Sequence, residues 1–268
     1  MACRPAVTCA GHSSEFDAER MPVSDRTVVA PTQTEQKRAN NLPFQPTTFV
    51  GRTSEQAAIA RLLANPACRL LTLHGPGGIG KTRLALAVVA NEVDAFPDGV
   101  VFVPLAAISM PDQLVSAIGE ALRLTFGGRS DPLAYLLSEL RERHMVVLDN
   151  FEHLVEGADL ISALLAHAPH LKVMVTSRER LNLQAEWLFN VDGLGYPQHQ
   201  PHAPSASQSV ATLTEYSAVD LFIQRATQVQ PALALDGKTL TAIVQICQHV
   251  AGMPLAIELA AASAWNRH

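Results

Sequence analysis

The sequence has no excess of basic residues. Its 20 lysines and arginines are outnumbered by 25 aspartates and glutamates, which gives a formal net charge of -5. A protein that binds nucleic acid electrostatically carries a clustered positive surface, whereas the basic residues here are scattered along the chain. We therefore expect no direct nucleic-acid contact from this segment.

Long apolar runs are also missing. The two longest, residues 100–110 and 253–265, are interrupted by Pro104, Pro254 and Glu258 and are shorter than the roughly 20 residues that span a bilayer. The first forty residues lack the positive start and the apolar core of a secretory signal. The sequence thus predicts no membrane partner and a cytoplasmic location.

Cysteine is scarce as well. The four cysteines lie far apart and lack the close pairs of a zinc site, which favours ordinary core or tail thiols in a reducing compartment. Two catalytic signatures are also absent: the histidine pair with an intervening glutamate of metalloproteases, and the Gly-x-Ser-x-Gly elbow of serine hydrolases. The cysteines are Cys3, Cys9, Cys68 and Cys247.

Among the features that are present, a glycine-rich motif carries the clearest chemistry. It follows an apolar strand predicted at residues 69–74 and opens a helix predicted at residues 81–94. In this context the motif is typical of a phosphate-binding loop, or P-loop, and a turn that only joins strand to helix is the weaker alternative. The motif reads Gly75, Pro76, Gly77, Gly78, Ile79, Gly80, Lys81 and Thr82.

P-loop chemistry suggests a role for each part of this motif. The backbone N–H groups of the glycines are expected to curl around phosphates, and the helix N-terminus adds partial positive charge at the same place. We expect Lys81 to reach the β- and γ-phosphates and the Thr82 hydroxyl to ligate Mg²⁺. The adjoining Arg83 is included among the expected cofactor-binding residues. The motif therefore predicts a protein that binds ATP or GTP.

The rest of the apolar pattern predicts an α/β fold. Apolar strands alternate with amphipathic helices from residue 42 onward, which is the order of a parallel sheet covered on both faces. We expect a P-loop NTPase domain over residues 42–192, with a five-stranded, mostly parallel sheet between helices. The predicted strands are residues 69–74, 100–105, 145–148, 171–176 and 186–191. The further predicted helices are residues 111–122, 131–143 and 152–167.

The segments outside this domain have other compositions. Residues 1–41 are rich in Pro, Ser, Thr, Gln and charged residues without sustained periodicity, which predicts a disordered leader. Residues 193–212 predict a flexible connection, because they are rich in Gly, Pro, His, Ser and Gln. Residues 213–268 predict a small helical subdomain, which we expect to be incomplete because the chain ends while still apolar. Its predicted helices are residues 217–229, 238–250 and a third from about 255.

A carboxylate and an arginine follow two of the predicted strands. Asp149 ends the third strand at the sheet edge beside the P-loop, where we expect it to be the second Mg²⁺ partner, through water. A helix cap or turn role is the alternative for Asp149. Arg178 follows the fourth strand at the same edge and is expected to stabilise the γ-phosphate charge, although alone it would indicate a solvated turn. The expected catalytic residues are Lys81, Asp149 and Arg178, and the expected metal ligands are Thr82 and Asp149.

The residue after Asp149 bears on hydrolysis. Asn150 carries an amide, which cannot take a proton from an attacking water as a carboxylate can. Glu152 lies two residues further on and is a substitute base, with an acid in the first turn of a helix as an equal alternative. Fast hydrolysis is therefore not expected.

Five segments, in this order, resemble the STAND class of signalling NTPases. The likeness is greatest to the NB-ARC-like ATPase module of bacterial transcriptional regulators of the LuxR/AfsR type, and it covers about residues 42–264. Such proteins join the module to helix-turn-helix or adenylate cyclase domains and to helical repeats. Because such domains are missing here, the resemblance implies a fragment or a truncated product. The segments are residues 49–52, the P-loop, and residues 146–153, 175–178 and 252–256.

The resemblance also implies roles for single residues. Arg178 matches the sensor arginine of the family, and Pro254 matches a proline that packs on the adenine. The preference for adenine over guanine rests on this resemblance and on the absence of an Asn-Lys-x-Asp guanine signature. The segment implied to lie against the adenine and ribose is Phe49, Val50, Gly51 and Arg52.

The leading functional hypothesis is an ATP/ADP-binding signalling switch. In it ADP holds a closed state, ATP permits self-association, and slow Mg²⁺-dependent hydrolysis resets the balance. A nucleotide-binding scaffold without turnover stays open because of Asn150. A P-loop phosphotransferase is the third hypothesis, but it needs an arginine-bearing lid after the third strand, and the sequence shows none. The expected partners are nucleotide, copies of the chain, and regulatory domains outside it.

Overall fold

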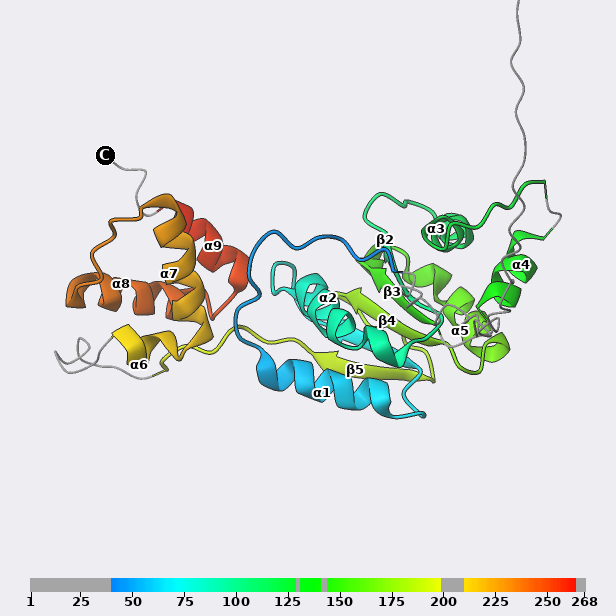
Figure 1. Cartoon of the computed structure of the whole chain (residues 1–268), viewed down its shortest axis with the longest axis horizontal. Coiled ribbons are helices and arrows are strands. Elements are labelled where there is room, and N and C mark those ends of the chain that lie inside the picture. Colours follow the sequence, from blue (N-terminus) through cyan, green and yellow to red (C-terminus); the bar gives the residue numbers. More distant parts are fainter. Residues whose placement is uncertain (1–39, 129–130, 141–143, 199–209, 264–268) are drawn as a thin grey trace, which may run out of the picture. The chain divides into compact units, whose positions relative to one another are not determined.

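The computed structural model describes residues 40–128, 131–140, 144–198 and 210–263 (Figure 1). Nearly all of the predicted leader, most of the second half of the predicted connection and the end of the helix predicted at residues 131–143 lie outside these described residues. The predicted domain boundaries therefore stay predictions.

A five-stranded sheet forms the centre of the fold, with the strand order β2-β3-β4-β1-β5. The sequence predicted a mostly parallel sheet, and every pairing within it is parallel. The carboxyl ends of β1, β3 and β4 consequently lie at one edge of the sheet, and the P-loop leaves β1 at that edge. The strands are β1 (Leu70–His74), β2 (Val100–Pro104), β3 (Met145–Asp149), β4 (Lys172–Ser177) and β5 (Glu186–Asn190).

Helices cover both faces of the sheet, because successive strand residues point to opposite sides. In β3, Val146 and Leu148 join an apolar cluster with α3, α4 and α5, while Met145 and Val147 join a second cluster with α1 and α2. All four side chains are fully buried. The helices are α1 (Thr53–Ala64), α2 (Lys81–Asn91), α3 (Leu114–Ala121), α4 (Pro132–Glu139) and α5 (Ala158–His167).

Three predicted helices begin or end differently in the structure. The helix predicted from residue 111 starts as a 3-10 helix, η2 (Pro111–Gln113), and the one predicted to reach residue 94 ends earlier and is followed by η1 (Val93–Ala95). The helix predicted from residue 152 begins as η3 (Phe151–His153) and η4 (Val155–Gly157). Short 3-10 turns at helix ends satisfy backbone groups that lack α-helical partners, and apolar periodicity does not register them.

The remaining helices form a third apolar cluster of their own, which includes Phe222, Ile243 and Ile257. Asp236 caps α8 by accepting a hydrogen bond from the Thr239 N–H at 2.8 Å. No helix among the described residues is long and apolar enough to cross a membrane. The helices of this part, called the helical part below, are α6 (Val210–Thr214), α7 (Ser217–Val229), α8 (Gly237–His249) and α9 (Pro254–Ser263).

Candidate functional site

The P-loop joins β1 to α2, and its last glycine has a backbone conformation that other residues disfavour. Gly80 caps the N-terminus of α2 with a φ of 91°, in the left-handed region that a side chain disfavours. A Cβ on Gly77 would lie 2.7 Å from a guanidinium nitrogen of Arg178, so the loop and this arginine are in close contact. Two segments of the predicted site, about a hundred residues apart, therefore meet.

Lys81 is the first residue of α2 and its side chain folds back over the loop. Its Nζ donates hydrogen bonds to the carbonyl oxygens of Gly75 at 2.8 Å and Pro76 at 3.1 Å. Burial lowers the pKa of Lys81, and the nearby carboxylate of Glu152 opposes that shift. The cation is thus held at the loop, with the carboxylates of Glu152 and Asp149 nearby.

Asp149, at the end of β3, gathers two hydroxyl groups. Its Oδ1 accepts hydrogen bonds from Oγ1 of Thr82 and Oγ1 of Thr176, each at 2.6 Å. The structure therefore brings the two predicted metal ligands into direct contact at the P-loop edge of the sheet. Hydroxyl and carboxylate oxygens are the ligands that a hard cation prefers. Among the described residues, no group of three or more His, Cys, Asp or Glu side chains forms a separate metal site.

The backbone after β3 explains why residue 150 is an asparagine. Asn150 has a φ of 66°, a left-handed conformation that Asn tolerates better than most residues, and its N–H donates to Thr176 Oγ1 at 2.9 Å. This turn starts η3, which buries Phe151 completely and brings Glu152 to the P-loop side.

Glu152 and Arg178 form an ion pair, with 3.0 Å between Glu152 Oε1 and Arg178 Nε. The Arg178 side chain is 62% exposed and the Glu152 side chain 16% exposed. Glu152 Oε2 is buried and accepts no hydrogen bond within the described part of the chain. A buried carboxylate oxygen without a hydrogen-bond partner among the described residues therefore lies near Lys81.

A cavity of about 280 Å³ lies at this edge. It is lined by parts of the P-loop, the ends of β3 and β4, and the first turns of α9. Half of the predicted site residues line it, and Asp149 does not. Leu255 and Glu258 had not been predicted. For Glu258 the signal was its helical spacing from Pro254, since residues four apart share a helix face. The lining is Gly77, Gly78, Gly80, Lys81, Thr82, Arg83, Asn150, Glu152, Thr176, Arg178, Pro254, Leu255 and Glu258.

The segment Phe49–Arg52 does not line this cavity. The buried guanidinium of Arg52 donates to the carbonyl oxygens of Ile79 at 2.9 Å and Asp192 at 2.8 Å, and burial lowers its pKa. Val50 packs against the apolar cluster of the helical part. A Cβ on Gly51, whose φ is 69°, would overlap the Ser217 side chain. In the structure this segment supports the P-loop and links it to α7.

Arg83, the residue after Thr82, connects three elements. Its Nη2 donates to the carbonyl oxygens of Thr47 at 2.9 Å and Thr48 at 3.0 Å, and its guanidinium carbon lies 5.8 Å from the centre of the Phe49 ring. Its Nη1 lies 3.7 Å from Glu258 Oε1 on α9. Arg83, which was predicted to bind the cofactor, thus also contacts the helical part.

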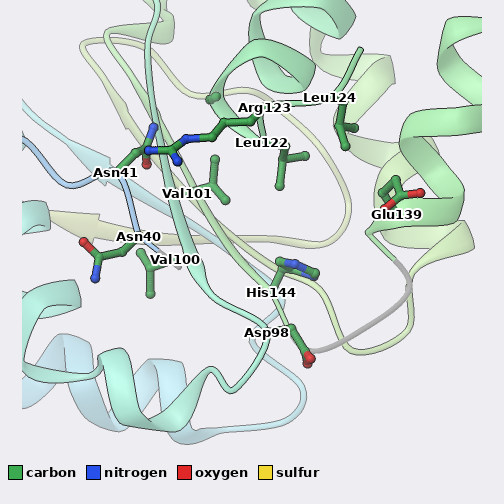
Figure 2. A pocket seen from close by; sticks show the side chains of 11 residues that line it. Asn40, Asn41, Asp98, Val100, Val101, Leu122, Arg123, Leu124, Glu139 and His144 are labelled. Carbon is green, nitrogen blue, oxygen red and sulfur yellow. The ribbon is translucent and has the colours of Figure 1, made fainter. Parts of the chain in front are cut away.

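A second cavity, of about 260 Å³, lies at the other edge of the sheet (Figure 2). Val100 at the start of β2 and His144 just before β3 line it, together with Asp98, Arg123 and Glu139. Because parallel strands all begin at this edge, the cavity is separated from the P-loop by the length of the sheet. None of the predicted site residues lines it.

Part of the chain matches a known domain family, and two relatives share about a third of their aligned residues with it. Residues 65–182 match the family model described as an AAA domain. An uncharacterised protein of Mycobacterium tuberculosis is 34% identical over 218 residues, which cover 81% of this chain and 50% of that protein. Another protein of Mycobacterium tuberculosis, provisionally named an HTH-type transcriptional regulator, is 34% identical over 209 residues, or 72% of this chain and 20% of the relative. The chain spans half or less of the length of these relatives.

Solved structures show the same fold. The Walker-type ATPase of Pyrococcus abyssi aligns with a TM-score of 0.51 at 14% identity, covering 82% of this chain and 68% of that one. The ORC2 protein of Aeropyrum pernix, solved as ADPNP–ADP complexes, aligns with a TM-score of 0.52 at 15% identity, covering 82% and 63%. The chain therefore has the P-loop NTPase fold, and its residues 65–182 match an AAA domain.

Proposed function

We propose that the chain is the ATP/ADP-binding module of a STAND-type signalling switch, of the NB-ARC-like branch, with slow Mg²⁺-dependent ATP hydrolysis. The observation that carries this proposal is that one cavity is lined both by the P-loop edge of the sheet and by α9 of the helical part. A nucleotide bound there would touch both parts. The presence or absence of a γ-phosphate would then change the contacts between them.

In this proposal the residues keep the roles that their chemistry suggests. The loop from Gly75 to Gly80 cradles the phosphates, and Lys81 leaves the two carbonyl oxygens for the β- and γ-phosphates. Thr82 and Asp149 hold Mg²⁺, which supplies positive charge to the phosphates when bound. Arg178 stabilises the negative charge of the γ-phosphate.

For the adenosine end, we propose that Pro254 packs on the adenine. The same proposal puts the segment Phe49–Arg52 beside the adenine and ribose, outside the cavity that holds the phosphates, with the Arg52 guanidinium hydrogen-bonded to the loop carbonyl of Ile79. The adenine-nucleotide complexes of the Aeropyrum pernix protein support an adenine nucleotide here. The relative with the provisional name of a transcriptional regulator supports a regulatory role. The proposal further includes self-association, a cytoplasmic location and no nucleic-acid contact by this segment.

The test is equilibrium binding and turnover of ATP, ADP and GTP with Mg²⁺. We expect adenine-selective binding and slow ATP turnover by the wild-type chain. Lys81→Ala should weaken nucleotide binding by about ten- to a hundredfold, because it removes a charge-assisted contact to phosphate. Lys238→Ala, at an exposed position on α8, is the matched control and should bind normally.

The outcomes separate the hypotheses. Equal affinity for GTP, or binding that does not depend on Lys81, would contradict the proposed switch. Tight ADP binding with no detectable ATP turnover would instead support a scaffold that binds nucleotide without hydrolysing it.

A further inference from the structure

Glu258 is a carboxylate in a cavity that we propose holds phosphates. It lies on α9, one turn after Pro254, and its side chain is 33% exposed. Negative charge beside a phosphate group is unfavourable unless a cation compensates it. The structure provides two cations for this one side chain.

The two cations come from different elements. Glu258 Oε1 lies 3.0 Å from Arg225 Nε on α7 and 3.7 Å from Arg83 Nη1 on α2. Arg225 is buried, and its Nη2 has no hydrogen-bond partner among the described residues. Glu258 therefore supplies the main negative charge that compensates buried Arg225. It also pairs with Arg83 on the helix that follows the P-loop.

Several contacts hold the Arg83 side chain in place, so its position can fix that of Glu258. The two backbone carbonyls of Thr47 and Thr48 and the face of Phe49 fix its guanidinium, and Arg83 itself is in the first turn of α2. Within the described part of the chain, the Arg83–Glu258 contact is the only side-chain ion pair that joins α2 to the helical part. A backbone hydrogen bond adds to this contact: the N–H of Leu255 on α9 donates to the Gly78 carbonyl oxygen of the P-loop at 3.2 Å.

We propose that Arg83, Glu258 and Arg225 form an ionic relay that positions α9 over the nucleotide pocket. Glu258 is a positioning residue in this relay: it holds α9, and with it Pro254, against the P-loop helix, and it ties that position to α7. The inference rests on the proposed function, because it assigns to the relay the closure of the same nucleotide site.

The relay makes a distinct prediction for a double-mutant cycle. Arg83→Met and Glu258→Gln each remove the ionic contact, while the amide oxygen introduced by Glu258→Gln can still accept a hydrogen bond from Arg225. Each single variant should weaken ADP binding about fivefold, the upper range for a partly exposed ion pair. The double variant should bind ADP no more weakly than either single variant, since the contact can be lost only once.

The experiment measures ADP dissociation constants with Mg²⁺ by isothermal titration for the four proteins of the cycle, with their thermal unfolding recorded without nucleotide. Pro254→Ala is made alone as a fifth protein and together with Glu258→Gln as a sixth. If Glu258 acts through the position of α9, the Pro254→Ala effect on ADP affinity should shrink in the Glu258→Gln background.

Additive losses in the Arg83/Glu258 cycle, or single variants that bind ADP like the wild type, would overturn the relay. Either result counts against the relay only if ADP binding by the wild-type chain is weakened by Lys81→Ala. Binding that is independent of Lys81 would overturn the proposed function itself, so the two failures are distinguishable.

Discussion

At the scale of single residues, the site is a set of polar groups that satisfy one another. Thr82 and Thr176 donate to Asp149, Lys81 donates to the loop carbonyls, and Glu152 pairs with Arg178. Glu152 differs from the others because one of its oxygens has no hydrogen-bond partner among the described residues. That difference leads to a prediction about hydrolysis.

We expect Glu152→Gln to bind ATP as the wild type does but to hydrolyse it at least about a hundredfold more slowly. A general base contributes roughly 10²–10⁴ in rate, and the amide at position 150 cannot supply one. Single-turnover ATP hydrolysis with Mg²⁺ measures the effect. Glu156→Gln, which changes an exposed acid in the next turn, is the control; equal rates for the two variants would refute the role of Glu152 as the base.

Cys247 offers a prediction about pH. Burial raises the pKa of its thiol from the ordinary 9.0 to about 12, so between pH 9 and 12 the unfolded chain loses a proton that the folded chain keeps. The free energy of unfolding contributed by this group is therefore fully present below pH 9 and is lost as the pH rises toward 12. Urea unfolding from pH 8 to 10.5 should show a steeper decline for the wild type than for Cys247→Ala. Parallel curves would contradict this assignment.

At the scale of elements, the turn between β3 and η3 decides where the acidic side chains lie. Asn150 in its left-handed conformation ends the strand and lets the chain reach Glu152 within one 3-10 turn. Local backbone geometry thus accounts for an asparagine at this position.

Substitution of Asn150 tests that account. Asn150→Val should lower the free energy of unfolding by about 1–2 kcal/mol, because a β-branched side chain is strained at positive φ. Asn150→Gly, which accepts this conformation freely, should stay close to the wild type. Urea denaturation of both variants measures the difference, and equal losses would show that backbone strain is not what selects the residue.

The sequence predicted most elements because their signals are local. The five strands are apolar runs bounded by polar turns, and α7 occurs at the predicted residues 217–229. Helix α1 had not been predicted as an element, although it packs Ile59 and Leu63 into the core beside α2. The 3-10 starts of η2 and η3 were missed for a different reason, since periodicity reports burial and not hydrogen-bond type.

At the scale of the whole molecule, the nucleotide pocket depends on contacts between segments that are far apart in the sequence. Leu194 donates its N–H to Gly252 O at 2.8 Å, and Leu255 donates to Gly78 O. These contacts place the start of α9 at the P-loop. A ligand in the pocket should therefore stabilise both sides of it.

We expect ADP with Mg²⁺, at about a hundred times its dissociation constant, to raise the free energy of unfolding by about 2.7 kcal/mol. Amide hydrogen exchange should slow in α9 as well as in α2, because both elements line the pocket. At the same ADP concentration Lys81→Ala, which we expect to bind ADP about ten- to a hundredfold more weakly, should gain only about 0.4–1.4 kcal/mol and show correspondingly less slowing of exchange. Slower exchange in α2 with unchanged exchange in α9 would exclude α9 from the site.

Short-range sequence patterns were enough to predict the P-loop, the parallel α/β order, and the positions of Asp149 and Arg178 at the ends of β3 and β4. The patterns are glycines before a Lys-Thr pair, and apolar runs that end in polar residues. The packing of the folded chain was needed to establish that Glu152 pairs with Arg178, that Arg52 hydrogen-bonds to the loop, and that Glu258 contacts Arg83. Such contacts join residues separated by 26 to 175 positions, and their geometry depends on how whole elements pack, which no local pattern encodes.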